Sequence, residues 1–144
     1  MNTKQIAIGT LVGGIALYAT GYLIFDLAFG SFYSANVGSA TGVERDAQLQ
    51  WAIVLGSFSY AALVTLGIAS RAGSSTIGAG VKIGAVVGFL LWFTVDFILY
   101  GYTNVANLTR TIVDPLLEIV HGGIGGAVIA VVIGKIPASG GRQE

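Results

Sequence analysis

The sequence predicts an all-α integral membrane protein with four transmembrane helices. Only 10% of the 144 residues are charged, against about 25% in soluble domains. Hydrophobic residues make up 54% of the chain, and 22 glycines add further apolar length. The few charges divide the chain into four apolar stretches, each near the 20 or so residues that cross a bilayer as a helix. These observations exclude soluble globular and disordered proteins.

The composition also excludes several functions. Seven basic residues balance seven acidic ones, so the chain has no excess of positive charge with which to bind nucleic acid. Cysteine is absent, which excludes disulfides, thiolate metal sites and cysteine nucleophiles. Glycine pairs that resemble phosphate-binding loops lie beside or inside apolar stretches, where glycine serves helix packing. No enzyme class is favoured.

The predicted helices form one transmembrane domain over residues 1–136. They cover residues 5–29, 51–70, 81–102 and 115–134. The first stretch is about twice as long as the apolar part of a signal peptide, so we expect it to be retained. Among the connections, only residues 30–50 are long enough to hold structure of their own. Residues 137–144 are expected to form a frayed cytoplasmic tail.

The basic residues predict the orientation of the chain. Five of them lie on one side of the four-helix topology: Lys4, Arg71, Lys82, Lys135 and Arg142. Only Arg45 and Arg110 lie on the other side. Because short loops rich in Lys and Arg stay in the cytoplasm, we expect both termini to be cytoplasmic.

The two halves of the chain resemble each other. Residues 8–13 (IGTLVG) match residues 83–88 (IGAVVG), and residues 30–36 (GSFYSAN) match residues 101–107 (GYTNVAN). If the repeat is real, two tandem helical hairpins pack about a pseudo-two-fold axis along the membrane normal. The first and third helices would then meet the second and fourth at the centre.

Glycines at four-residue spacing predict close helix contacts, because small residues let backbones approach. They are Gly9, Gly13, Gly80, Gly84, Gly88, Gly122 and Gly126. Such spacing serves packing within the chain or a dimer face. In a chain of four helices, packing within the chain is the commoner use. Four short helices bury too few faces to enclose a pathway, so we also expect a homo-oligomer or a larger membrane complex in the lipid bilayer.

Six ionisable residues lie on the outer side of the predicted topology, five of them at or within the helices and Arg110 in the connection before the fourth helix. They are Asp26, Asp96, Arg110, Asp114, Glu118 and His121. A charge at membrane depth costs about 2.5–3.5 kcal/mol, so each one needs a partner or a function. Asp114, Glu118 and His121 are spaced i, i+4 and i+7, which places them on one face of the fourth helix.

Structural roles are available for two of the carboxylates. Asp114 precedes Pro115, which matches a helix N-cap followed by proline at the first helical position. Asp26 would reach the outer interface or pair with Arg110. Asp96 interrupts an apolar run and has no local helix end to cap, so a functional role is as good an explanation for it as a structural one.

Glu118 and His121 are the most informative pair. The internal repeat aligns them with Ala52 and Leu55, so the scaffold does not require polar residues at these positions. A histidine one turn from a buried glutamate can share a proton with it near neutral pH.

Three functions fit these residues. Chains of Asp, Glu and His inside a bundle mark proton or cation pathways. In that case Asp96, Glu118 and His121 would face one cavity open to the outside, with Arg110 at its mouth. A tetrapyrrole-binding subunit would instead use His121 as the ligand, because the neighbouring glycines leave room for a flat macrocycle. An accessory or structural subunit of a membrane complex is the third interpretation.

A metal site is only weakly indicated. Glu118 and His121 form one Glu-x-x-His motif, which is half of the di-iron carboxylate pattern. The sequence holds a single copy, and the other candidates are aspartates. We therefore expect no resident cofactor, and transport is favoured over pigment binding.

A family resemblance rests on short motifs at the helix ends. The residues are Asp26, Phe32, Tyr33 and Gly38 after the first helix, Thr103, Asn104 and Ala106 after the third, and Val113 and Asp114 before the fourth. With them the chain resembles the small four-span bacterial membrane proteins classed as domains of unknown function. The resemblance implies a bacterial inner-membrane location and no established activity. The chain departs from that pattern where two glycines follow His121, since Trp-Gly is typical there.

Overall fold

The computed structural model describes residues 1–43, 45–71 and 76–137, and these form an all-α four-helix fold without a strand. The elements in chain order are α1 (Thr3–Gly21), the π-helix η1 (Tyr22–Ala28), α2 (Gly30–Ala35), α3 (Gln50–Ala69), α4 (Ile77–Tyr102) and α5 (Leu108–Gly134). Four segments are long and apolar enough to cross a membrane: Thr3–Ala28, α3, α4 and α5. The chain is therefore a membrane protein. Most of the predicted tail, with Arg142, lies outside the described residues.

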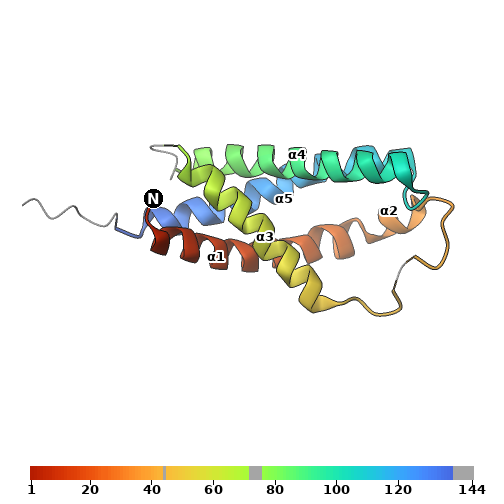
Figure 1. The fold of residues 1–144 in the computed structure, drawn as a ribbon, viewed down its shortest axis with the longest axis horizontal. Helices are drawn as coiled ribbons and strands as arrows, with labels where there is room; N and C mark the ends of the chain where they lie inside the picture. Colours follow the sequence, from red (N-terminus) through yellow and green to blue (C-terminus); the bar gives the residue numbers. More distant parts are fainter. Residues whose placement is uncertain (44, 72–75, 138–144) are drawn as a thin grey trace, which may run out of the picture.

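The helices alternate in direction along one long axis (Figure 1). The start of α1 and the end of α5 lie at one end of the molecule, called here the terminal end. The short helix α2 and the α4–α5 turn lie at the opposite end, called here the α2 end. Helix α4 packs along α5, while α1 contacts both α3 and α5. Helix α4 also makes a smaller contact with α3, so α1 and α4 each contact α3 and α5.

Side-chain caps fix where three of the long helices begin. The Asn2 side chain accepts a hydrogen bond from the Gln5 backbone, and the Gln5 side chain accepts one from the Asn2 backbone. Thr76 caps α4 through the backbone N–H of Ala79. Asn107 caps α5 through the backbone N–H of Arg110, at 2.9 Å. Such caps satisfy backbone donors that have no partner in the first turn of a helix.

The predicted start of the fourth helix was wrong. Helix α5 begins at Leu108, so Asp114 is not an N-cap, and Pro115 lies buried inside the helix. The Asn107 cap is held from outside the helix, because its side-chain amide donates to the Asn36 side chain at 3.1 Å. This tertiary contact outweighs the local Asp-Pro signal. Proline inside the helix leaves the carbonyl of Thr111, four residues earlier, without its helical donor.

The linker that follows α2 is tied to the α4–α5 turn. Val37 and Ala106 form an isolated antiparallel bridge. The backbone N–H of Gly38 donates to Val105 at 2.9 Å, and a side chain on Gly38 would overlap the backbone of Asn104. The predicted internal repeat aligns Asn36 with Asn107, and these two side chains hydrogen-bond to each other. The two hairpins are thus joined at the α2 end.

All seven predicted packing glycines lie at helix contacts within the chain. On α4, a Cβ at Gly80 or Gly84 would overlap the backbone of Gly126 or Gly122 on α5. On α1, a Cβ at Gly9 would lie 3.0 Å from side chains of α3 and α5, and one at Gly13 would lie 2.6 Å from an α5 side chain. The hydrophobic core fills the terminal half of the bundle. It comprises Leu17, Tyr60, Ala61, Val64, Ile68, Ile129, Ala130 and Ile133.

Candidate functional site

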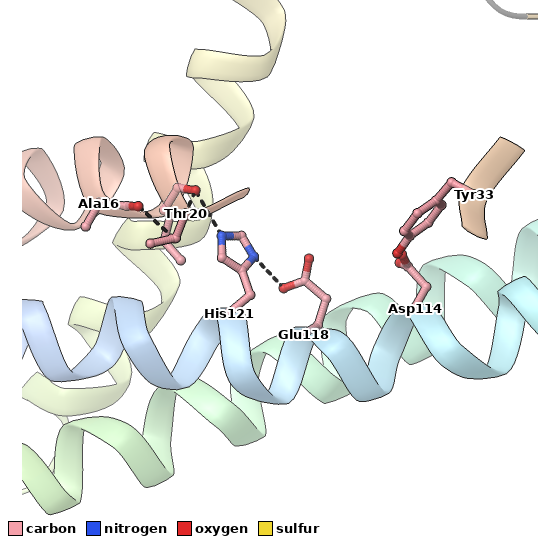
Figure 2. A network of polar contacts seen from close by, with 7 residues as sticks. Ala16, Thr20, Tyr33, Asp114, Glu118 and His121 are labelled. Atoms are coloured by element: carbon pink, nitrogen blue, oxygen red, sulfur yellow. Dashed lines mark hydrogen bonds and ion pairs between the residues drawn. The ribbon is translucent and has the colours of Figure 1, made fainter. Parts of the chain in front are cut away.

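Four ionisable side chains form a row along one face of α5. They are Arg110, Asp114, Glu118 and His121. Glu118 and His121 are buried, and Asp114 and Arg110 are half-buried. Figure 2 shows Glu118 between His121 on one side and Asp114 on the other, with Tyr33 pointing at Asp114 from α2. The predicted i, i+4, i+7 face therefore looks into the protein.

His121 has hydrogen-bond partners at both ring nitrogens. Its Nδ1 lies 2.9 Å from Oε2 of Glu118, and its Nε2 lies 2.9 Å from the backbone carbonyl of Leu17 (Figure 2). A carbonyl oxygen only accepts, so Nε2 carries a hydrogen. The contact between Nδ1 and Oε2 then needs one proton. The pair exists either as imidazole with carboxylic acid or as imidazolium with carboxylate, and moving one proton interconverts the two forms.

The sequence placed this pair in the outer half of the fourth helix, and the structure corrects that depth. Because α5 begins at Leu108 rather than at Pro115, His121 lies midway between Leu108 and Gly134. Only 2% of Glu118 and 6% of His121 are exposed. The pair therefore lies near the middle of a helix that is long enough to span the bilayer.

Aromatic side chains enclose the His121 ring. Phe25 of η1 meets it edge-on at a centroid distance of 5.3 Å, and Tyr60 of α3 does so at 5.8 Å. A Cβ at Gly21 would lie 3.5 Å from the ring. The π-helix η1 follows Gly21 directly and carries Phe25. Single π-helical turns inside α-helices are frequent at functional sites.

At the α2 end the row continues through Tyr33. Its hydroxyl donates to Asp114, and the Arg110 guanidinium lies 4.9 Å from the centroid of its ring. Burial, followed by the hydrogen bond to Asp114, raises the pKa of the Tyr33 phenol. The phenol therefore stays neutral, and it remains a donor to Asp114 over the physiological pH range.

Asp96 joins the row from α4. Its carboxyl interacts with Asp114 and Glu118, and with the opposite charge of Arg110. Its Oδ2 atom is buried and has no hydrogen-bond donor among the described residues. Asp96 thus adds a carboxyl from a second helix to the row on α5.

A pocket of about 70 Å³ opens beside Asp96 at the α2 end. It is lined by Asp96, Leu99, Tyr100, Thr103, Val105, Ala106, Arg110 and Thr111. A cavity needs about 10–15 Å³ of such volume to hold a water molecule, so the pocket has room for water. A proton or cation pathway was expected to place Asp96, Glu118 and His121 on one cavity. The structure instead puts Asp96 and Arg110 on the pocket wall and encloses Glu118 and His121 beyond it.

Asp26 does not belong to this group. It lies exposed on η1 and accepts a hydrogen bond from the Gln48 side chain at 3.2 Å. Of the two structural roles expected for Asp26, the structure shows the surface position, whereas Arg110 lies over the Tyr33 ring. Asp26 therefore has the surface role that its position near a helix end allows.

The donor set at His121 bears on the two cofactor hypotheses. Within the described residues, no group of three or more His, Asp or Glu side chains is arranged to hold a metal ion. Both nitrogens of His121 already face a hydrogen-bond partner. A metal or tetrapyrrole iron would bind there only after one of these contacts broke and the aromatic enclosure opened.

Sequence reasoning missed two tyrosines at this site. Tyr33 belongs to the motif of the family resemblance but was given no role at the site, and Tyr60 was not singled out. A signal for Tyr60 exists, because tyrosines in membrane proteins gather at the interfaces, whereas Tyr60 lies in the middle of α3. No local signal pairs Tyr33 with Asp114, since 81 residues separate them.

Comparison of the chain with protein-family models, curated proteins and solved structures found no match. Its description therefore rests on its own residues: a membrane protein of four apolar helices with a buried Glu118–His121 pair at its centre.

Proposed function

We propose that this protein takes up protons from the α2 end and passes them to Glu118 and His121 in the middle of the bundle. The observation that carries this proposal is the pair of 2.9 Å contacts at the two ring nitrogens of His121, one to Glu118 and one to Leu17. Since Nε2 of His121 donates to the Leu17 carbonyl, the remaining proton can lie on Nδ1 of His121 or on Oε2 of Glu118, and these two atoms are 2.9 Å apart. A buried pair of this kind binds and releases a proton with little movement of heavy atoms.

A route from water supports the proposal. The pocket at the α2 end reaches Asp96, and Asp96 interacts with Asp114. Asp114 lies one helical turn from Glu118, which contacts His121 directly. Asp, Glu and His chains of this kind are typical of proton relays in membranes. With both termini in the cytoplasm, as the basic residues predict, uptake would begin on the outer face.

The other half of the bundle makes this access one-sided. Between His121 and the terminal end, the buried polar side chains of the described residues are Thr65 and Gln5. Gln5 donates to the carbonyls of Ile133 and Ile136, so it closes a helix end. The relay stops at His121 in this conformation. Proton transfer across the membrane would therefore require a second arrangement of the helices, as in alternating access.

The residues favour a proton over a metal cation. Sodium, magnesium and calcium ions need several oxygen ligands at once, whereas one oxygen of Glu118 already faces His121. Arg110 adds a fixed positive charge to the wall of the pocket. A proton needs only one acceptor at each step and can move along the row despite that charge.

Reconstitution into liposomes tests the proposal. An imposed pH gradient should collapse faster with the wild-type protein than with Glu118→Gln or the double variant Asp96→Asn with Glu118→Gln. The matched control is Asp26→Asn, which also removes one carboxylate but lies outside the row. We expect the control to retain the wild-type flux. Equal flux from wild-type protein and the double variant would overturn the proposal.

A further inference from the structure

The hydroxyl of Tyr60 is buried and lacks a hydrogen-bond partner among the described residues. The residue is 6% exposed, and its hydroxyl forms no hydrogen bond of acceptable geometry with any described residue. The carboxyl of Glu118 is its acidic neighbour and lies close enough to interact with it. A buried hydroxyl without a partner costs free energy, so its placement requires a reason.

Two glycines make room for this hydroxyl. A Cβ at Gly88 on α4 or at Gly122 on α5 would overlap the Tyr60 oxygen. The phenol of α3 therefore passes between two helices that are in close contact, and its ring also meets His121 edge-on at 5.8 Å. Core packing alone would be served by phenylalanine, which fills the same volume without a polar atom.

We propose that Tyr60 is the positioning residue of the Glu118–His121 pair, a role that rests on the proton function proposed above. Its hydroxyl donates to the Glu118 carboxylate when the shared proton has moved from Oε2 of Glu118 to Nδ1 of His121. The O–H bond of the acid breaks, an N–H bond forms, and the new carboxylate gains a donor. To complete this hydrogen bond, the Tyr60 hydroxyl and the Glu118 carboxylate turn toward each other.

This assignment gives each partner of Glu118 a separate task. His121 exchanges the proton with one carboxyl oxygen, while Tyr60 supports the charge that the exchange leaves behind. Charge-assisted hydrogen bonds are about twice as strong as neutral ones. The unpaired hydroxyl is then a feature of the conformation in which Glu118 still holds its proton.

The variant Tyr60→Phe tests the proposal, because it keeps the ring and removes one oxygen atom. We expect proton flux in liposomes to fall about tenfold, because the Glu118 carboxylate loses a charge-assisted hydrogen bond. The matched control is Tyr18→Phe, which also removes one hydroxyl, but an exposed one that donates to Gln50 at 2.8 Å. The control should retain wild-type flux.

A spectroscopic measurement separates this proposal from the proposed function. The chain has one histidine and three glutamates, so ¹⁵N-labelled imidazole reports on His121 alone. The ¹³C carboxyl resonance of Glu118 is assigned as the one that disappears in Glu118→Gln. Tyr60→Phe should reduce the imidazolium–carboxylate population and shift the carboxyl resonance, whether or not protons cross the membrane. Unchanged resonances in a folded Tyr60→Phe protein would overturn the role of Tyr60. If the resonances change but the wild-type protein carries no proton flux in liposomes, the role of Tyr60 is upheld and the transport proposal is overturned.

Discussion

At the scale of single residues, the backbone carbonyl of Leu17 decides the chemistry of His121. By accepting from Nε2 at 2.9 Å, it directs Nδ1 toward Glu118. The amino-acid sequence gives the Glu118–His121 spacing, but not the partner on α1, because that contact spans 104 residues. The proton-sharing pair was therefore predictable, whereas its orientation was not.

The orientation of His121 leads to a prediction about its tautomer. When the ring is neutral, the hydrogen should lie on Nε2, because the Leu17 carbonyl accepts and cannot donate. The ¹⁵N spectrum of the single histidine, recorded in bilayers, measures this directly. Glu118→Gln should preserve the Nε2–H tautomer while removing the shared proton. A dominant Nδ1–H tautomer in the wild-type protein would contradict the assigned geometry.

Tyr33 leads to a prediction about alkaline pH. Its pKa is raised in the folded protein by burial and by Asp114, so folding favours the neutral phenol. That stabilisation is fully present below the unfolded-state pKa of about 10 and is lost as the pH rises above it. Tyr33→Phe should therefore lose less stability than the wild-type protein between about pH 9.5 and 12. Thermal unfolding in detergent measures the difference, and parallel losses would contradict the Tyr33–Asp114 contact.

At the scale of helices, the start of α5 shows where sequence reasoning failed. Asp114 and Pro115 form a good local start signal, yet the helix begins at Leu108 because Asn107 is held by Asn36. The seven extra residues carry Arg110 into the helix and move His121 to its middle. The existence of four helices followed from composition and charge spacing. Their ends depended on tertiary contacts, as for α5.

Close packing of α4 on α5 leads to a prediction about stability. Gly84→Ala places a methyl group against the backbone of Gly122, so the two helices must separate. Overpacking of this kind costs about 1–3 kcal/mol. Gly56→Ala is the matched control, because a Cβ there meets nothing within 4 Å. Unfolding in mixed micelles should show a loss for Gly84→Ala and none for Gly56→Ala, and equal stabilities would argue against the packing.

At the scale of the whole molecule, burial is unevenly distributed. Helix α5 is the central helix. Half of the residues in its most apolar stretch are buried inside the protein, whereas only 11% are buried in the corresponding stretch of α4. The first half of α3 crosses away from the other helices (Figure 1), and Trp51 is 68% exposed. Lipid or a second copy of the chain would cover this surface.

We expect the protein to form a homo-oligomer. Native mass measurement in mild detergent tests this expectation, and a stable monomer would contradict it.

The arrangement of charges leads to the last prediction, which concerns orientation. Lys4 and Lys135 lie at the terminal end, whereas Ser39 and Asn104 lie at the α2 end with the pocket. Because basic loops stay in the cytoplasm, Ser39→Cys and Asn104→Cys should react with a membrane-impermeant maleimide added outside intact cells. Lys4→Cys and Lys135→Cys should react only after permeabilisation. The natural chain has no cysteine, so each signal comes from one position. Labelling of Lys135→Cys in intact cells would show the opposite orientation. The pocket beside Asp96 would then take its protons from the cytoplasm.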